Sequence, residues 1–363
     1  MSDATRREFL QATALAGVTA LLPNGARAGE SLLASADAVV FIMMTGGPSQ
    51  HDTFDPKPEA PSQIRSPFAP IRTTVPGLHV TELFPHIAKI AHKLAFVRSA
   101  HHADVPMHEV GYQYLNSGKL FRDGPEWPSV GAVVDNLHRK EQYDPFRCIV
   151  SPDRRVYLGL KVSHGQDCGW LRSHSPMVWT WDDGVPTLIE QCERAFHALS
   201  STTKVAVLNQ FTTVFGTPTW DCHADGGRLA TTLRDIRDTV APSFDFAFAR
   251  LVTALDEAGL LERTLVVATG EFGRTPRFNC SGGRDHWPAA WTTLFAGGGV
   301  QGGRIVGSTD ADGAMPKDRP VHARDIPATI FRALGYGPET TIPGPTGAPV
   351  LAYDGQPIRE LFA

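Results

Sequence analysis

Short, continuous apolar runs alternate along the chain with segments of helical periodicity. The apolar runs lie at residues 38–45, 94–99, 205–211, 264–270 and 292–298. Runs of this length without polar interruption are typical of strands that are buried on both faces of a parallel sheet. We therefore expect these runs to form the centre of one sheet.

The helical patterns lie between these runs. Residues 243–260 carry apolar positions at helical spacing, and Gly259 can cap the C-terminus. Shorter helices are expected over residues 81–94 and 323–335. Strands that alternate with helices predict an α/β fold with a doubly wound, mostly parallel sheet flanked by helices.

Other segments have no clear period. Residues 55–80 are rich in proline and predict a long excursion over the surface. No linker divides the remaining chain, so residues 36–363 are expected to form a single domain with large insertions.

The first residues have the pattern of an export signal. Arg6 and Arg7 precede an apolar stretch, and Ala26 and Ala28 form a small-residue cleavage site. This pattern predicts a twin-arginine signal peptide over residues 1–28, cleaved after Ala28. The expected destination is the periplasm or the exterior, the expected partner is the twin-arginine export machinery, and no membrane span is expected in the mature chain.

Composition and charge narrow the classes of partner. The chain of 363 residues is 42% hydrophobic and has a formal net charge of −4, without a basic cluster. This balance is typical of a soluble globular protein and gives no electrostatic footprint for nucleic acid.

Polar residues gather where the apolar runs end. The first run is followed by "GGPSQHDTFD", which contains Ser49, Asp52 and Thr53. Because ligands bind beyond the carboxyl ends of parallel strands, these residues are candidates for a site. Ser49 also lies in "GPSQH", one residue short of a nucleophile elbow, so a metal-free serine hydrolase is a third possible function.

Further candidates follow or precede the other runs. Asp221 and His223 stand two residues apart, so in an extended segment both project to one side. A carboxylate and an imidazole placed in this way can bind a divalent metal or form an orienting pair. The other candidates are Glu271 and Arg274 in "GEFGRTP", Arg284, Asp285 and His286 in "GRDHW", and His108 in "HHADVPMH".

Taken in order, these motifs resemble a known family. The succession "RREFL", "GGPSQHDTFDPKP", "WDCH", "GEFGRTPR", "GRDHWP" and "AGGGVQGGRIVGSTD" is similar to the exported bacterial family known as domain of unknown function 1501. That family resembles the alkaline phosphatase and sulfatase superfamily, so the resemblance implies the fold of that superfamily and a metal-dependent hydrolase of sulfate or phosphate esters.

The resemblance implies roles for the candidate residues. A divalent cation, zinc or calcium, would be held as one ion or two; the implied ligands are Asp52, Asp221, His223, Glu271, Asp285 and His286. Arg274 would act in catalysis, and Arg274, Arg284 and His108 would bind a small anionic ester or a sulfated glycan. Ser49 or Thr53 would be the nucleophile.

The motifs depart from the superfamily in two places. The first apolar run ends in Thr45-Gly46-Gly47, where the superfamily places a metal-binding aspartate, and Glu271 is followed by Phe272 where a histidine is expected. These departures leave open a non-catalytic binding module with a degraded metal site that recognises a sulfated glycan or a protein partner.

Overall fold

A computed structural model describes most of the chain. The described residues are 34–138, 148–153, 155–159, 162–174, 177–179, 184–199 and 203–362. They belong to one compact unit, Leu33–Ala363. The predicted signal peptide, residues 1–28, lies outside the described residues.

Strand β1 (Ala38–Met43) lies in the middle of the main sheet, and its side chains enter two separate cores. Val40 and Ile42 belong to one hydrophobic cluster, whereas Val39, Phe41 and Met43 belong to the other. Successive residues of a strand point to opposite faces, so a strand covered on both sides needs apolar residues at every position. This requirement explains the continuous apolar run.

The main sheet has nine strands in the order β12-β4-β11-β8-β1-β7-β5-β6, with β15 paired to β4. The remaining strands of this sheet are β4 (Leu94–His101), β5 (Cys148–Ser151), β6 (Met177–Val178), β7 (Val205–Asn209), β8 (Thr264–Thr269), β11 (Trp291–Ala296), β12 (Arg304–Val306) and β15 (Val321–His322). Each predicted apolar run overlaps one of the strands, which confirms those assignments.

Strand β11 is antiparallel to both of its neighbours, β4 and β8, whereas the other pairings in the described part of the sheet are parallel. The carboxyl ends of the parallel strands therefore share one sheet edge with the amino end of β11. Residues that precede β11 come to the same edge as residues that follow the other strands.

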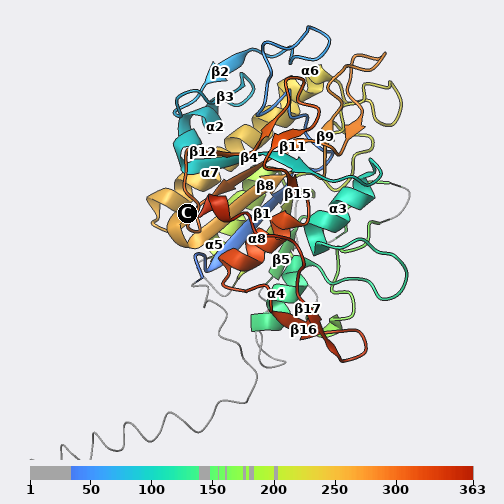
Figure 1. Cartoon of the computed structure of the whole chain (residues 1–363), viewed down its shortest axis with the longest axis vertical. Coiled ribbons are helices and arrows are strands. Elements are labelled where there is room, and N and C mark those ends of the chain that lie inside the picture. Colours follow the sequence, from blue (N-terminus) through green and yellow to red (C-terminus); the bar gives the residue numbers. More distant parts are fainter. Residues whose placement is uncertain are drawn as a thin grey trace, which may run out of the picture. The chain divides into compact units, whose positions relative to one another are not determined.

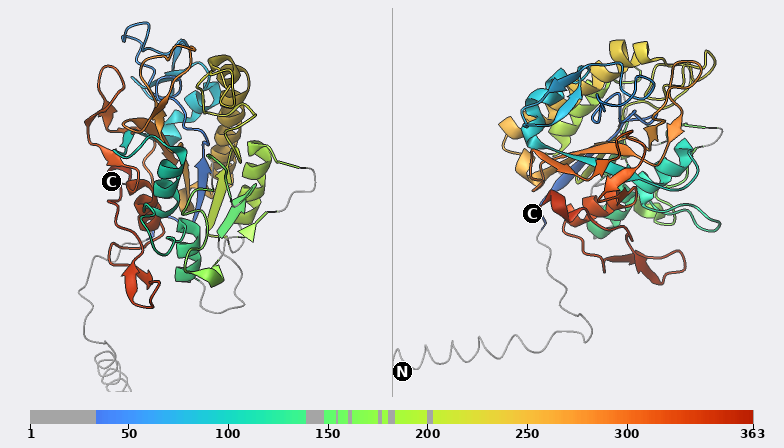
Figure 2. Two further views of the ribbon diagram at one scale, coloured as in Figure 1. Left: turned by 90° about the vertical axis from the view of Figure 1, so that its right-hand side faces the viewer. Right: turned by 45° about the horizontal axis from the view of Figure 1, so that its top comes forward.

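Helices cover both faces of the sheet (Figures 1 and 2). One core contains residues of α2 (Pro85–Ile90), α5 (Leu188–Leu199) and α7 (Ala241–Glu257). The other contains residues of α3 (His108–Ser117), α4 (Val130–His138) and α8 (Asp325–Ala333). The predicted α/β fold with helices on both faces of a mostly parallel sheet is confirmed.

Short elements complete the described fold. They are the pairs β2 (Pro70–Arg72) with β3 (His79–Thr81), β9 (Gly273–Arg274) with β10 (His286–Trp287), β13 (Ser308–Thr309) with β14 (Pro316–Asp318) and β16 (Thr341–Pro343) with β17 (Pro349–Leu351), together with the helical turns α6 (Leu233–Asp235), η1 (Ala91–Lys93), η2 (Arg172–His174), η3 (Ile236–Val240), η4 (Leu261–Arg263) and η5 (Arg359–Leu361).

Several predicted boundaries need correction. The helix expected over 81–94 begins at Pro85, because Thr81 pairs in β3 and proline is favourable in the first turn of a helix. The helix expected from residue 243 is preceded by α6 and η3, which begin after a capping box between Thr232 and Asp235. Its predicted end is confirmed, because Gly259 adopts a φ of +68° just beyond α7.

The proline-rich segment 55–80 is more deeply packed than predicted. Phe68, Leu78 and Val80 are buried in the core that contains α2 and α7. The expectation of a purely surface excursion is therefore wrong for this segment. Among the described residues, no helix combines the length and the apolar character needed to cross a membrane.

One buried carboxylate joins two helices of the same layer. Asp245 on α7 accepts hydrogen bonds from the backbone N–H groups of His86 (2.9 Å) and Ile87 (2.8 Å) in the first turn of α2. We predict that Asp245→Ala lowers the free energy of unfolding by about 2 kcal/mol, because both donors lose this acceptor. Urea denaturation measures the loss.

Asp256 on the same helix provides the matched control. Its ion pair with Lys93 (2.7 Å) lies at the surface, so Asp256→Ala should cost less than about 1 kcal/mol. Equal losses of stability in the two variants would refute the role of Asp245 as the acceptor that joins α7 to α2.

Candidate functional site

Polar residues from several strand ends meet at one edge of the main sheet. His108 begins α3 after β4, Asp221 and His223 follow β7, and Glu271 follows β8. His286 lies in β10, shortly before β11. The reversed direction of β11 therefore brings His286 to the edge where the other residues leave the sheet.

Three imidazoles are oriented by a hydrogen bond from Nδ1. The acceptors are Oε1 of Glu271 for His108 (2.6 Å), Oδ1 of Asp285 for His223 (3.0 Å) and the carbonyl oxygen of Pro106 for His286 (2.8 Å). A carboxylate or carbonyl oxygen only accepts, so each Nδ1 carries a proton. This pattern of outer acceptors is typical of histidines that bind a metal through Nε2.

The Nε2 atoms converge on one buried carboxylate. His223 and His286 each place Nε2 at 3.1 Å from Oδ1 of Asp221, and His108 places Nε2 at 3.3 Å from Oδ2. We call Asp221 and these three histidines the Asp221 cluster. Nε2 of His108, Nε2 of His223 and Oδ2 of Asp221 are buried without a hydrogen-bond partner.

Each imidazole of the Asp221 cluster lies between two acceptors, but a neutral imidazole has only one proton. Burial lowers the pKa of His286 to about 4, so its Nε2 presents a lone pair to Asp221 at neutral pH. Burial also acts to lower the pKa of His108, but the carboxylates of Asp221 and Glu271 outweigh it and raise this pKa to about 9. At neutral pH His108 is therefore protonated on both nitrogens and His286 is neutral, so it is the lone pair of His286 facing Asp221 that leaves a place for a cation.

The residues present fit a metal ion. His108, Asp221 and His286 each offer a ligand atom, and these atoms lie within 4.8 Å of one another. Imidazole nitrogen and carboxylate oxygen are the ligands that zinc accepts most often after thiolate. His223 adds a further Nε2 next to Asp221. The cluster can therefore supply two nitrogens and one carboxylate to one ion, with Nε2 of His223 next to the same carboxylate.

Arg274 balances the charge of Asp221. Both side chains are fully buried, and a guanidinium N–H of Arg274 donates to Oδ1 of Asp221. Burial alone would raise the pKa of Asp221, but the charge of Arg274 and the hydrogen bonds of the histidines hold it well below its usual range. Arg274 also donates to the carbonyl oxygens of Gly46 and Gly47. The carboxylate therefore stays ionised.

Two glycines allow the backbones of the site to approach closely. Gly46 has a φ of +110°, and a Cβ at this position would lie 2.6 Å from the amide nitrogen of Asp221. A Cβ on Gly111 in α3 would lie 2.2 Å from the carbonyl oxygen of Glu271. These contacts set the distance between the strand exits and the helix that carries His108.

The structure brings several of the sequence-predicted residues together. Asp221, His223 and His286 share the Asp221 cluster, while Glu271 and Asp285 bind the outer nitrogens of His108 and His223. The resemblance implies substrate binding for His108, but this residue belongs to the group that could hold a metal. The spacing of the histidines in "HHADVPMH" allows metal binding, but the partnership of His108 with Glu271 and Asp221 depends on how α3 docks through Gly111.

Asp52 and Arg284 pair with each other and not with the Asp221 cluster, whereas the resemblance implies a metal ligand and a substrate-binding residue. Nε of Arg284 donates to Oδ2 of Asp52 (2.8 Å), and both side chains are buried. Arg284 also donates to the carbonyl oxygens of Ile64 (2.9 Å), Thr275 (3.1 Å) and Pro276. Asp52 is therefore the partner of a structural arginine, and Arg284 has no donor left for a substrate anion.

Arg274, Ser49 and Thr53 are likewise engaged with protein atoms. Arg274 is fully buried and binds Asp221 and three carbonyl groups, so it does not form an anion clamp. The hydroxyl of Thr53 donates to the carbonyl oxygen of Ser49 (2.7 Å), and Oγ of Ser49 accepts from the amide of Asp52 (3.2 Å). Both hydroxyls therefore serve the loop after β1 and not the Asp221 cluster.

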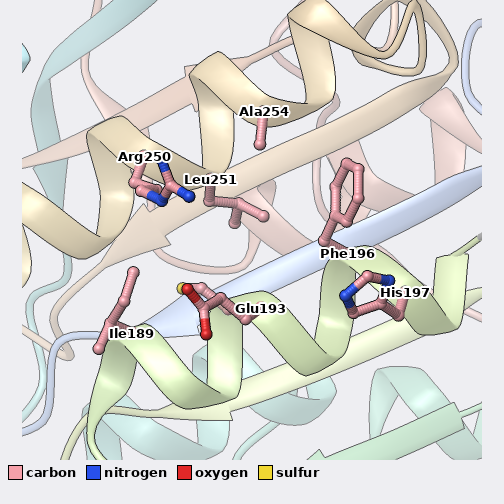
Figure 3. Close-up of a pocket in the computed structure, with 8 residues that line it drawn as sticks. Ile189, Glu193, Phe196, His197, Arg250, Leu251 and Ala254 are labelled. Carbon is pink, nitrogen blue, oxygen red and sulfur yellow. The ribbon is translucent and has the colours of Figure 1, made fainter.

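A pocket between α5 and α7 lies apart from these residues (Figure 3). Its lining is Ile189, Cys192, Glu193, Phe196, His197, Arg250, Leu251 and Ala254. None of these residues belongs to the Asp221 cluster or orients it, so the chemistry of the site is not found there.

The chain matches one protein family over most of its length. The family model described as "Protein of unknown function (DUF1501)" matches residues 36–205 and 202–362. No curated protein matches the chain.

Several solved structures are similar to the chain. The phosphonate monoester hydrolase SpPMH from Silicibacter pomeroyi has a TM-score of 0.48 and 13% identity, over 90% of this chain and 76% of that one. The PsFucS1 sulfatase from Pseudoalteromonas sp. has a TM-score of 0.46 and 12% identity, over 90% and 76%. A protein in the alkaline phosphatase superfamily from Vibrio parahaemolyticus has a TM-score of 0.43 and 10% identity, over 93% and 76%.

The pairing of Asp52 with Arg284 predicts that Asp52 contributes to the stability of the fold but not to metal binding. Asp52→Ala leaves a buried guanidinium without its counter-charge, so we expect a loss of about 3–5 kcal/mol in the free energy of unfolding. The metal content per folded chain should stay that of the wild type. Denaturant unfolding and elemental analysis measure the two quantities.

The exposed pair of Asp37 and Arg263 serves as the control. Asp37→Ala should change the stability by less than about 1 kcal/mol. If folded Asp52→Ala loses its metal, Asp52 takes part in the metal site and the assignment fails.

Proposed function

The chain belongs to the DUF1501 family, and we propose that it is an exported, metal-dependent hydrolase of sulfate or phosphate esters. One observation carries this proposal: three imidazoles lie between two acceptors each, and their inner nitrogens share the buried carboxylate of Asp221. A divalent cation among these atoms would replace the proton on Nε2 of His108 and accept the lone pair of His286, and such a cation is a common centre of ester hydrolysis.

The donor set favours one ion of the zinc type. Nε2 of His108, Nε2 of His286 and a carboxylate oxygen of Asp221 would hold it, with Nε2 of His223 next to the same carboxylate. Calcium prefers six or more oxygen ligands, whereas zinc accepts imidazole nitrogen and carboxylate oxygen. When bound, such an ion polarises the ester oxygen and makes water a stronger nucleophile.

The other residues of the site position these ligands. Glu271 accepts a hydrogen bond from Nδ1–H of His108 and a second one from the amide N–H of Gly46 (3.0 Å). Asp285 holds His223 in the same way. Arg274 keeps Asp221 ionised, so this carboxylate keeps its negative charge although it is buried away from water. These residues determine tautomer and orientation without touching the substrate.

Water is the attacking group in this proposal. Ser49 and Thr53 hydrogen bond within their own loop, so neither hydroxyl is presented as a nucleophile. Water forms the new bond to phosphorus or sulfur, the bond to the alcohol oxygen breaks, and the alcohol leaves with a proton. Labelling of Ser49 by an active-site organophosphate would instead support a serine hydrolase.

A second function has one specific observation in its favour. Arg274 and Arg284 are buried and bound to protein oxygens, so they offer no clamp for an anionic substrate. The same site could therefore bind a sulfated glycan or a partner protein without turnover. Measurements of hydrolysis decide between the two functions.

Export is proposed from the sequence. Arg6 and Arg7 precede an apolar stretch and a small-residue cleavage site. We predict that the periplasmic protein begins at Gly29 and that replacing Arg6 and Arg7 together by Lys retains the precursor in the cytoplasm. N-terminal sequencing and cell fractionation measure this; a cytoplasmic wild-type protein with an intact N-terminus would contradict it.

The metal proposal predicts one divalent ion per chain after reconstitution with zinc. His286→Ala and Asp221→Ala should lose the ion and reduce kcat/KM for 4-nitrophenyl phosphate or sulfate by at least about a hundredfold. Glu271→Gln should weaken zinc binding about 10–100-fold, because the hydrogen bond that orients His108 is weaker. Elemental analysis, calorimetric zinc titration and initial rates measure these effects.

His79 on β3 offers a control, because its side chain is exposed. His79→Ala should retain both the ion and the rate. A wild-type chain that binds no stoichiometric ion after reconstitution would refute the metal proposal. A loaded chain that turns over neither ester would leave the binding module as the function.

A further inference from the structure

We propose that the ester bound at the Asp221 cluster has an apolar alcohol part, held by four residues beside His286. These residues are Val105, Met107, Trp287 and Met315, which we call the apolar rim. The inference rests on the proposed function, which places the anionic sulfate or phosphate group at the cluster. It adds that the alcohol part of the ester is apolar.

Hydrogen bonds place the rim on both sides of the segment that carries His286. On one side, Nδ1 of His286 donates to the carbonyl oxygen of Pro106 (2.8 Å), between Val105 and Met107. On the other side, Nε1 of Trp287 donates to the carbonyl oxygen of Ala314 (2.6 Å), next to Met315. The segments around residues 105–107 and 314–315 therefore flank the same short strand, β10.

The rim is exposed where the cluster opens. Val105, Met107 and Met315 expose 56%, 50% and 58% of their surface. The side chains of His286 and His223 keep 18% and 16% of their surface exposed, whereas the side chain of His108 keeps 5%. The accessible side of the cluster is therefore the side of His286 and His223, and the rim lies beside it at His286. Exposed apolar groups beside a polar centre are typical of a ligand site.

The charges around this opening disfavour a polyanionic substrate. Asp104, Asp285 and Asp312 lie on or next to the segments that border His286. Arg274 and Arg284 are fully buried, and the exposed cations Arg277 and Lys317 on neighbouring segments offset these carboxylates only in part. An ester with one anionic group at the cation and an apolar remainder matches this surface, whereas a glycan with several sulfates meets repulsion.

Two phosphonates with the same anionic group test the rim without turnover. We expect zinc-loaded protein to bind phenylphosphonate at least about tenfold more tightly than methylphosphonate, because the ring buries apolar surface of the rim. In the variant Val105→Ser/Met107→Ser/Met315→Ser, this ratio should fall below about threefold. Isothermal titration calorimetry measures the affinities, and elemental analysis verifies the zinc content.

The matched control is Val185→Ser/Met177→Ser, because these residues are also exposed, at 75% and 43%, but are remote in sequence from the rim. The control should keep the wild-type ratio. Equal affinity for the two phosphonates, no measurable binding of either, or the same loss in the control overturns the apolar rim.

Rates separate this inference from the proposed function. A preference for phenylphosphonate without any hydrolysis of 4-nitrophenyl phosphate or sulfate supports the rim and refutes the hydrolase. Hydrolysis with equal kcat/KM for methyl and aryl esters supports the hydrolase and overturns the rim. A higher kcat/KM for glucosamine 6-sulfate than for 4-nitrophenyl sulfate also overturns it.

Discussion

The ion pair between Asp221 and Arg274 is the interaction on which the site depends. Both groups are fully buried, and an unpaired charge at this depth would cost several kcal/mol. The same guanidinium binds the carbonyl oxygens of Gly46 and Gly47. The guanidinium of Arg274 therefore fixes the end of β1 and the segment after β7. It also keeps the shared carboxylate of Asp221 ionised.

The polar loop after β1 has a structural role that arises from the same need to pair buried charge. Gln50 donates to the carbonyl oxygens of Arg274 and Gly313, each at 2.9 Å, and Asp52 neutralises Arg284. These bonds connect the loop to segments that are far away in the sequence. A buried polar group is stable only when it is fully paired, so this loop determines how the surrounding segments pack. Its residue types resemble a catalytic set because both roles require groups that form strong hydrogen bonds.

The central strands and half of the site could be predicted from the sequence, for a clear physical reason. Parallel strands bring the residues after them to one edge of the sheet, so Asp221, His223 and Glu271 could be grouped from their distance to apolar runs. The sequence pattern does not show which long side chains are buried and paired with one another. The sequence therefore suggests an anion clamp at Arg274, and it does not reveal the role of His108, which depends on how Gly111 lets α3 approach Glu271.

The residue after Glu271 supports the proposal of one cation over that of two. Phe272 is fully buried, and its ring centroid lies 4.9 Å from that of His108 and 4.5 Å from that of His286. Phe272 thus stands at the sequence position where the resemblance predicts a histidine, and its ring packs against His108 and His286. The imidazole beside Glu271 is supplied instead by His108 from α3, with its outer nitrogen bound to that carboxylate. Glu271 then orients His108, which agrees with the single ion that we propose at Asp221.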